Sequence, residues 1–254
     1  MKSVIPCIIL IFSFLLSTGA LILASKLEKF EAGWRPELSA VWGIVLGTAL
    51  LVLYRFLIKS LGTRSFQISS SIRQITAAIL LVVGIFTVSV ICLHGEWMAR
   101  TEITPGMIID DLLYQVRPAY GEEVGFRFGL ANLTFGFFGF YPALIAGAVP
   151  FGLIHIMNFA TGHPVEWDYI LGVSLGGLLL TAIFMNFNLM AAVIAHYVWN
   201  FLALFFSKGF GLPQERLEGA PLSLAALALA SAYLIWRYGN LHKSGSSAIG
   251  MSKS

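Results

Sequence analysis

The chain has 254 residues, of which 57% are hydrophobic and only 11% are charged. Soluble domains carry roughly a quarter charged residues, so soluble globular, disordered and coiled-coil folds are excluded. The mean hydropathy of +0.82 agrees with this. The net charge of +3 is small, and no basic run supports nucleic-acid binding. We therefore expect a polytopic membrane protein whose partner is the lipid bilayer.

Three apolar segments of about the bilayer-spanning length are found in the first part of the chain. They cover residues 4–24, 38–58 and 74–93. The apolar region of a signal peptide is shorter, about 7–15 residues, so retention of the first segment as a span is favoured over its cleavage. Arg55 lies near the end of the second segment, where a long side chain can reach the interface.

The next segment, residues 94–121, has a different pattern and holds six charged residues. Within it, apolar residues recur at helical spacing: Ile108, Ile109, Leu112, Leu113 and Val116. Polar residues occupy the other side of the same helix: Asp110, Asp111, Gln115 and Arg117. This pattern predicts a short amphipathic helix that lies at the membrane interface and ends at Pro118.

Two long uncharged segments must each fold back on themselves. Residues 128–165 comprise 38 residues without a formal charge, which is too long for one straight span. The glycine- and proline-containing stretch 136–142 is the expected turn, and residues 186–188 are the expected turn within 169–207. A last span is expected at 220–236. The sequence thus predicts an all-α fold with about eight transmembrane helices, in one domain over residues 1–240, and a disordered tail over 241–254.

Six polar residues lie within apolar helices, where ionisable groups are rare and are functional candidates. They are Glu122, Glu123, Arg127, His155, His196 and Asn200. Glu123 and Arg127 are four residues apart with the acid first, which is the favoured orientation of a helical ion pair. Glu122 is rotated by about 100° from Glu123 and is left free to accept a proton. The alternative is that these three are interface charges at a helix start.

The two histidines and the asparagine complete a hydrolytic set. His196 and Asn200 lie four residues apart and project from one helix face, although hydrogen bonding between helices would also explain them. Because the spans alternate in direction, Glu122, His155 and His196 fall toward the membrane side that bears residues 94–121. A carboxylate and an imidazole can deprotonate a water, and a second imidazole and an amide N–H can stabilise an oxyanion.

Three motifs in this region resemble those of the CPBP family, which comprises type II CAAX prenyl endopeptidases and bacterial bacteriocin-processing or abortive-infection proteins. Residues 122–127 read EExxFR, residues 151–155 read FxxxH, and residues 196–200 read HxxxN. The resemblance covers residues 121–205 and implies an intramembrane glutamic endopeptidase with a catalytic core over about 121–206 and no metal or cofactor. By the motif match, Glu122 is the base, His155 its water-positioning partner, His196 and Asn200 the oxyanion site, and Glu123 and Arg127 support them.

The sequence departs from the family pattern at two places. Phe128 follows the motif arginine where the family usually has glycine, and the small polar residue upstream of the second motif is replaced by alanine and glycine at 146–148. These departures concern the shape of the substrate pocket. The substrate class stays open between a prenylated CAAX tail and a peptide or C-terminal anchor segment.

Two other classes of function compete with a glutamic peptidase. A zinc metallopeptidase usually places two histidines four residues apart on one helix with a glutamate between them, but here the partner of His196 is Asn200. A non-catalytic immunity protein, scaffold or proton transporter is the second alternative.

The membrane side of the site is predicted from the distribution of basic residues. With eight spans, both termini share a side that carries eight basic residues and no acidic one. This side is the better candidate for the cytoplasm, so the site is expected to open on the other side of a prokaryotic inner membrane.

Overall fold

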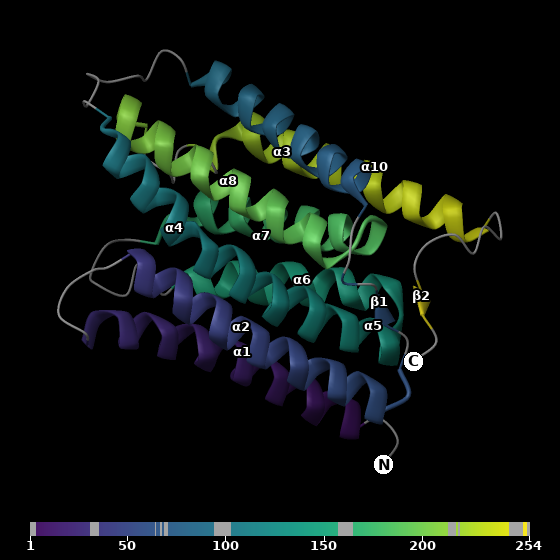
Figure 1. The fold of residues 1–254 in the computed structure, drawn as a ribbon. Coiled ribbons are helices and arrows are strands. Elements are labelled where there is room, and N and C mark those ends of the chain that lie inside the picture. The colour runs from purple at the N-terminus through teal and green to yellow at the C-terminus, as the bar shows by residue number, and fades with distance from the viewer. Residues whose placement is uncertain are drawn as a thin grey trace.

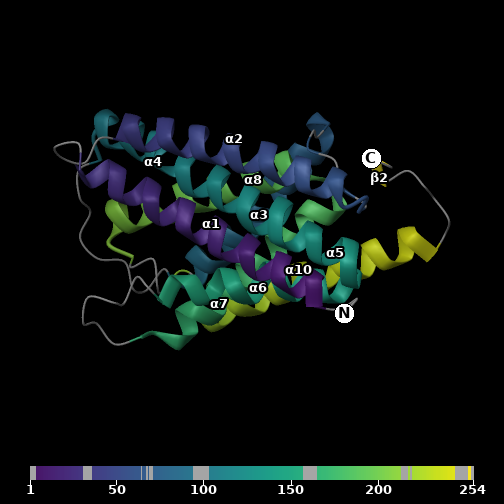
Figure 2. The same ribbon diagram turned by 90° about the horizontal axis from the view of Figure 1, so that it is seen from below.

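Helices make up almost all of the secondary structure in the computed structural model of the chain (Figures 1 and 2). The structure describes residues 4–30, 36–63, 65–66, 68, 71–93, 103–156, 165–212, 217, 219–243 and 251–252. The main helices are α1 (Val4–Phe30), α2 (Pro36–Ser60), α3 (Ile72–Cys92), α4 (Pro105–Glu122), the π-helix η2 (Glu123–Ala131), α5 (Asn132–Phe138), α6 (Phe140–Ile154), α7 (Trp167–Asn186), α8 (Leu189–Phe210) and α10 (Pro221–Lys243). A two-residue strand, β1 (Ser65–Phe66), pairs antiparallel with β2 (Met251–Ser252).

The prediction of an all-α membrane protein is confirmed. Among the described residues, five helices are long and apolar enough to cross a bilayer, namely α2, α3, α7, α8 and α10. Two shorter apolar helices are α1 as far as Ala20, and α6. The count of eight spans stays a prediction, but α1 begins and α10 ends at the same end of the bundle (Figures 1 and 2). The last helix extends to Lys243, beyond the expected start of the tail, and residues 244–250 lie outside the described part of the chain.

The amphipathic segment is part of the bundle, and the prediction that Pro118 ends it is wrong. Residues 105–138 form one unbroken helical run through α4, η2 and α5. This run lies alongside α2 in the same direction, because Gly43 packs against Arg117 and, further along both helices, Gly129 packs against Tyr54. A proline inside a helix removes one backbone hydrogen bond. Contact with α2 on both sides of Pro118 keeps the helix continuous.

Both predicted turns are present and depend on unusual backbone angles. The chain reverses between α5 and α6 at Gly139, whose φ of 85° and ψ of −165° are accessible to glycine alone among the common residues. It reverses again between α7 and α8 at Asn188, with φ of 133°. The side chain of Asn188 also caps α8 by accepting a hydrogen bond from the N–H of Ala191. The first turn places α6 beside α5, and the second places α8 beside α7.

Two glycines allow η2 to approach α1 and α2 closely. A Cβ atom at Gly125 would lie 2.9 Å from the Cβ of Ser17, and one at Gly129 would lie 2.5 Å from ring atoms of Tyr54. The Tyr54 hydroxyl donates to the carbonyl of Ser13 at 2.8 Å and lies 2.7 Å from the Ser17 hydroxyl. Segments of π-helix are rare and often occur at functional sites. Here η2 carries two of the candidate residues, and α1 and α2 hold it in place.

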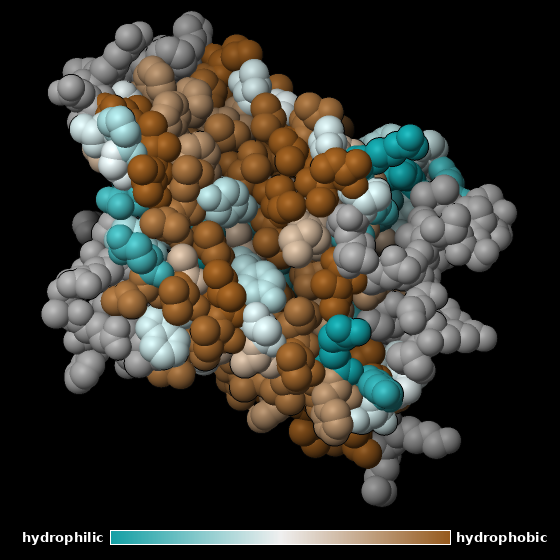
Figure 3. All heavy atoms as spheres, viewed as in Figure 1, coloured by the Kyte–Doolittle hydropathy of each residue, from teal (hydrophilic) through white to brown (hydrophobic). Residues whose placement is uncertain are grey.

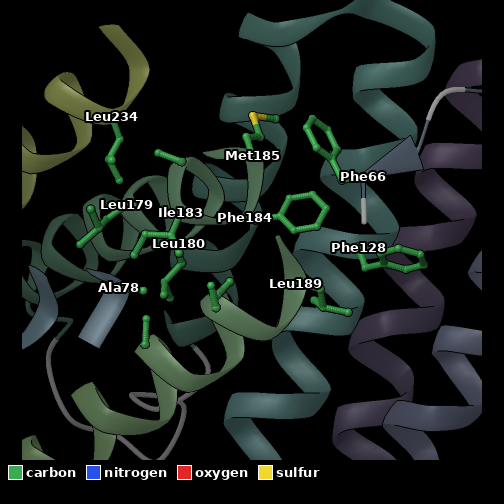
Figure 4. Close-up of a cluster of buried hydrophobic side chains, with 14 of the residues drawn as sticks. Phe66, Ala78, Phe128, Leu179, Leu180, Ile183, Phe184, Met185, Leu189 and Leu234 are labelled. Atoms are coloured by element: carbon green, nitrogen blue, oxygen red, sulfur yellow. The ribbon is translucent and has the colours of Figure 1, made fainter. Parts of the chain in front are cut away.

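The hydrophobic core is centred on α7, the most buried of the candidate spans. Figure 4 shows Ile183 and Phe184 of α7 among side chains of α8 and α10. The ring of Phe184 lies 5.0 Å from that of Phe66 in β1. The outer face in Figure 3 is covered mainly by hydrophobic side chains, as contact with lipid requires.

Gly129→Ala should destabilise the protein, because its new methyl group would meet the ring of Tyr54. That ring is fully buried and held by two hydrogen bonds, so it cannot move aside. Overpacking of this kind costs about 1–3 kcal/mol of unfolding free energy. Gly84→Ala in α3 is the matched control, because nothing lies within 4 Å of its position and alanine there should stabilise the helix by up to about 1 kcal/mol. Thermal unfolding in detergent measures both, and equal shifts for the two variants would contradict the packing argument.

Candidate active site

The four residues predicted to be catalytic line one cavity of about 290 Å³ between α4, α6, α7 and α8. Glu122 comes from the end of α4, His155 from the C-terminal cap of α6, and His196 and Asn200 from α8. The walls of the cavity also include side chains of α3, α7 and α10. Residues more than 70 positions apart in the sequence are thus brought to one place.

The site lies deeper in the bundle than the sequence indicates. The sequence suggests that Glu122 opens a span, but Glu122 is the last of the 18 residues of α4, and η2 and α5 follow it directly. This difference arises because the segment interpreted as an interfacial helix is the first half of the same helical run. Glu122 is therefore near the middle of a run that lies alongside the candidate span α2.

A buried ion cluster adjoins the cavity and is centred on one oxygen of Glu123. Nδ1 of His196 donates to Oε1 of Glu123 at 2.8 Å, and Nη1 of Arg127 lies 3.0 Å from the same oxygen. The Arg127 guanidinium also donates to the carbonyl of Gly177 at 3.2 Å and lies 4.2 Å from the centroid of the Phe151 ring. Glu123 and Arg127 are fully buried, and His196 is 4% exposed. The cluster therefore joins η2, α6, α7 and α8.

These contacts define which ring nitrogen of His196 faces the cavity. A carboxylate in an ion pair with arginine can only accept hydrogen bonds, so Nδ1 of His196 carries a proton. Its Nε2 lies 3.9 Å from Oε2 of Glu122, whose side chain is 15% exposed. This separation is too long for a direct hydrogen bond. An atom of a water or a substrate can contact both groups only from the cavity side, off the line that joins them.

His155 is oriented in the same way from α6. Its Nδ1 lies 2.8 Å from the carbonyl oxygen of Phe151, which can only accept, so Nδ1 carries the proton and Nε2 is left with its lone pair. The Phe151 ring lies 4.9 Å from the His155 ring and 5.8 Å from the His196 ring. Phe151 thus contacts both imidazoles and the Arg127 guanidinium. Its supporting role was not predicted, although it is the first residue of the FxxxH motif.

The position of Asn200 depends on contacts between α8 and α4. The Tyr197 hydroxyl donates to the carbonyl of Leu112 at 2.8 Å, and Lys208 forms an ion pair with Asp111. In the part of the chain that the structure describes, the Asn200 amide has no hydrogen-bond partner, so its N–H groups are available to the cavity. The described residues include no group of three or more His, Cys, Asp or Glu side chains arranged to hold a metal ion.

Comparison with known families shows that this site lies in a segment that matches one family model. Residues 104–202 match the family model described as Type II CAAX prenyl endopeptidase Rce1-like. The matched segment begins just before α4 and contains all three motifs and every residue of the ion cluster. No curated protein matches the chain. The match over residues 104–202 supports the resemblance to the CPBP family, and the five long apolar helices are those of an integral membrane protein.

Proposed function

We propose that the chain is an intramembrane endopeptidase of the glutamic type, which hydrolyses a peptide bond in a membrane-associated protein or peptide. Glu122 and His155 activate the water, and His196 and Asn200 stabilise the oxyanion. Glu123 and Arg127 position His196. The family match supports a CAAX-type membrane protease, and we place it in a prokaryotic inner membrane because the family that the motifs resemble includes bacterial proteins.

One observation carries this proposal: a line of contacts from Arg127 through Glu123 to His196 ends at Glu122 in the cavity wall. Two adjacent carboxylates have different surroundings along this line. Glu123 is fully buried, accepts a hydrogen bond from His196 and forms an ion pair with Arg127, whereas Glu122 is partly exposed to the cavity. This arrangement leaves Glu122 to act as a general base and uses Glu123 to fix an imidazole.

The base step needs the two groups that can accept a proton in the cavity. Glu122 takes a proton from a water, while the lone pair on Nε2 of His155 orients the same water. The hydroxide then attacks the carbonyl carbon of the scissile peptide bond and forms a tetrahedral intermediate. As this intermediate collapses, the C–N bond breaks and Glu122 gives the proton that it took from the water to the leaving amine. Each group is held from a different helix, and their relative position is set by packing of α6 against η2, which continues α4.

The oxyanion step uses the charge balance of the cluster. The carboxylates of Glu122 and Glu123 with Arg127 leave one net negative charge, and a protonated His196 cancels it. A buried cluster without net charge avoids an uncompensated desolvation cost. Protonated His196 then presents an N–H at Nε2, and Asn200 presents its amide N–H, to the oxygen that becomes negative. Glu123 stabilises this imidazolium as the aspartate of a serine-protease triad does.

Glu122→Gln and His155→Ala should each abolish hydrolysis, because the water loses either its base or its orienting partner. The measurement is cleavage by the purified full-length protein of internally quenched peptides ending in a CAAX sequence, with and without a prenyl group, and of a peptide from a membrane-anchor segment. Glu37→Gln, an exposed glutamate at the start of α2, is the control and should be as active as the wild type.

Wild-type turnover by Glu122→Gln would contradict the glutamic mechanism. Metal analysis of the same preparations tests the zinc alternative, because tightly bound zinc in a one-to-one ratio would assign the chemistry to a metal. A scaffold or immunity role replaces the enzyme if two results coincide. The first is that none of the peptides is cleaved, and the second is that Glu122→Gln cells show none of the defects of cells that lack the protein.

Asn200→Ala should lower kcat by about 10²–10³ with little change in KM, because an oxyanion contact strengthens only in the transition state. Asn200→Asp is the matched variant, since it keeps the shape of the side chain but loses the N–H donors. It should be at least as impaired as Asn200→Ala. A kinetically silent Asn200→Ala would remove Asn200 from the oxyanion site.

Arg127→Ala should act first on stability, because it leaves Glu123 as an uncompensated charge and removes the contacts with Gly177 and Phe151. Breaking a buried pair typically costs about 3–5 kcal/mol. Arg55→Ala, at an exposed position in α2, should change stability by less than about 0.5 kcal/mol. Thermal unfolding and yield measure the difference. A stable, abundant but inactive Arg127→Ala protein would place Arg127 in the reaction itself.

A further inference from the structure

One face of α4 carries a row of side chains directed along the inside of the bundle. Asp111, Gln115, Pro118 and Glu122 are spaced four, three and four residues apart, which places them on one side of a helix. Asp111 and Gln115 are only 4% and 6% exposed. Gln115, Pro118 and Glu122 all line the catalytic cavity. Two residues of the polar face that the sequence predicts at the membrane interface, Gln115 and Arg117, therefore line the cavity.

Gln115 differs from the other polar residues of this row. Asp111 is paired with Lys208, and Glu122 faces His196. The Gln115 carboxamide makes no hydrogen bond to any residue that the structure describes, although the residue is more than nine-tenths buried. Its amide atoms are not among the fully buried ones, so they keep surface toward the cavity, where a bound molecule can be their partner.

The chemistry of a peptide substrate matches this amide. A peptide bond reaches Glu122 only in an extended segment, because a helix keeps its peptide groups bonded internally. An extended segment in an apolar environment exposes N–H and C=O groups that need partners. A carboxamide supplies both donors and an acceptor. Among the residues that line the cavity, only Gln115 and Asn200 carry this group, and Asn200 is at the reaction centre.

On the basis of the proposed function, we infer that Gln115 is a positioning residue that binds the main chain of the substrate away from the scissile bond. The distance follows from helix geometry. Gln115 is seven residues before Glu122, a rise of about 10 Å. An extended chain advances about 3.3 Å per residue, so the bound peptide group lies about three residues from the bond that is cut.

Gln115→Met tests this role, because methionine has a similar shape but no hydrogen-bonding amide. Its kcat/KM for the peptide that the wild type cleaves should fall about five- to tenfold, the effect of one hydrogen bond. Its thermal stability should stay close to that of the wild type, because the amide makes no hydrogen bond to a described residue that the change would break. Leu113→Met, on the same helix but outside the cavity lining, is the control and should keep the wild-type kcat/KM.

Ester substrates locate the contact. In each, one backbone N–H of that peptide is replaced by oxygen, at positions two to four residues on either side of the scissile bond. With the wild type, one of these esters should lose about the same five- to tenfold. With Gln115→Met, that ester and the parent peptide should be cleaved equally well, because the contact is already missing.

Two outcomes would overturn the inference. In the first, Gln115→Met retains the wild-type kcat/KM. In the second, every ester loses as much activity with the variant as with the wild type. Either result removes Gln115 from the substrate path. A loss of thermal stability with unchanged ester discrimination would make Gln115 structural. These results differ from failure of the proposed function, in which the wild type itself cleaves none of the peptides or Glu122→Gln cleaves them normally.

Discussion

The carboxylate of Glu123 is the constraint on which the rest of the site depends. It is fully buried in a bundle with a lipid-facing surface, and one of its oxygens accepts a hydrogen bond from His196 and lies 3.0 Å from Nη1 of Arg127. A charge in such a place persists only if opposite charge and hydrogen bonds compensate for the lost water. Each partner comes with further contacts, since Arg127 reaches α7 and Phe151 of α6. Satisfying one carboxylate thus fixes three helices relative to η2 and sets the orientation of His196.

Because α4, η2 and α5 form one continuous helical run, Glu123 and Arg127 lie near the middle of that run. Glu122 and Glu123 lie at the junction of α4 and η2, and close contacts with α1 and α2 hold η2 from the outside. The inner side of the same run faces α6, α7 and α8. The helix that carries Glu122, the proposed base, is therefore held on both sides. The proposed hydrolysis requires such rigidity, because small displacements of catalytic groups cost large factors in rate.

Short-range spacing was sufficient to predict some of these features from the sequence. The four-residue separation of Glu123 and Arg127 predicts their ion pair, and Gly139 and Asn188 fall within the predicted turns. The contact of His196 with Glu123 joins residues 73 positions apart and was not predicted, because no local pattern encodes it. Phe151 and Gly177 were missed for the same reason. An aromatic ring and a glycine carbonyl acquire a role only when packing brings them to Arg127.

The misinterpretation of α4 has a more general physical cause. An amphipathic pattern reports that one side of a helix avoids apolar surroundings, but it does not say whether the polar side meets water or a polar cavity. At the surface of a bilayer, long charged side chains can reach water. On α4 the inner row instead contains an acid paired with a lysine, a glutamine, a proline and the glutamate of the site. Short side chains that cannot extend to the interface, combined with an unbroken helix into a catalytic motif, favour a cavity. If the chain is the proposed peptidase, this row marks the path by which the polar backbone of a substrate approaches Glu122.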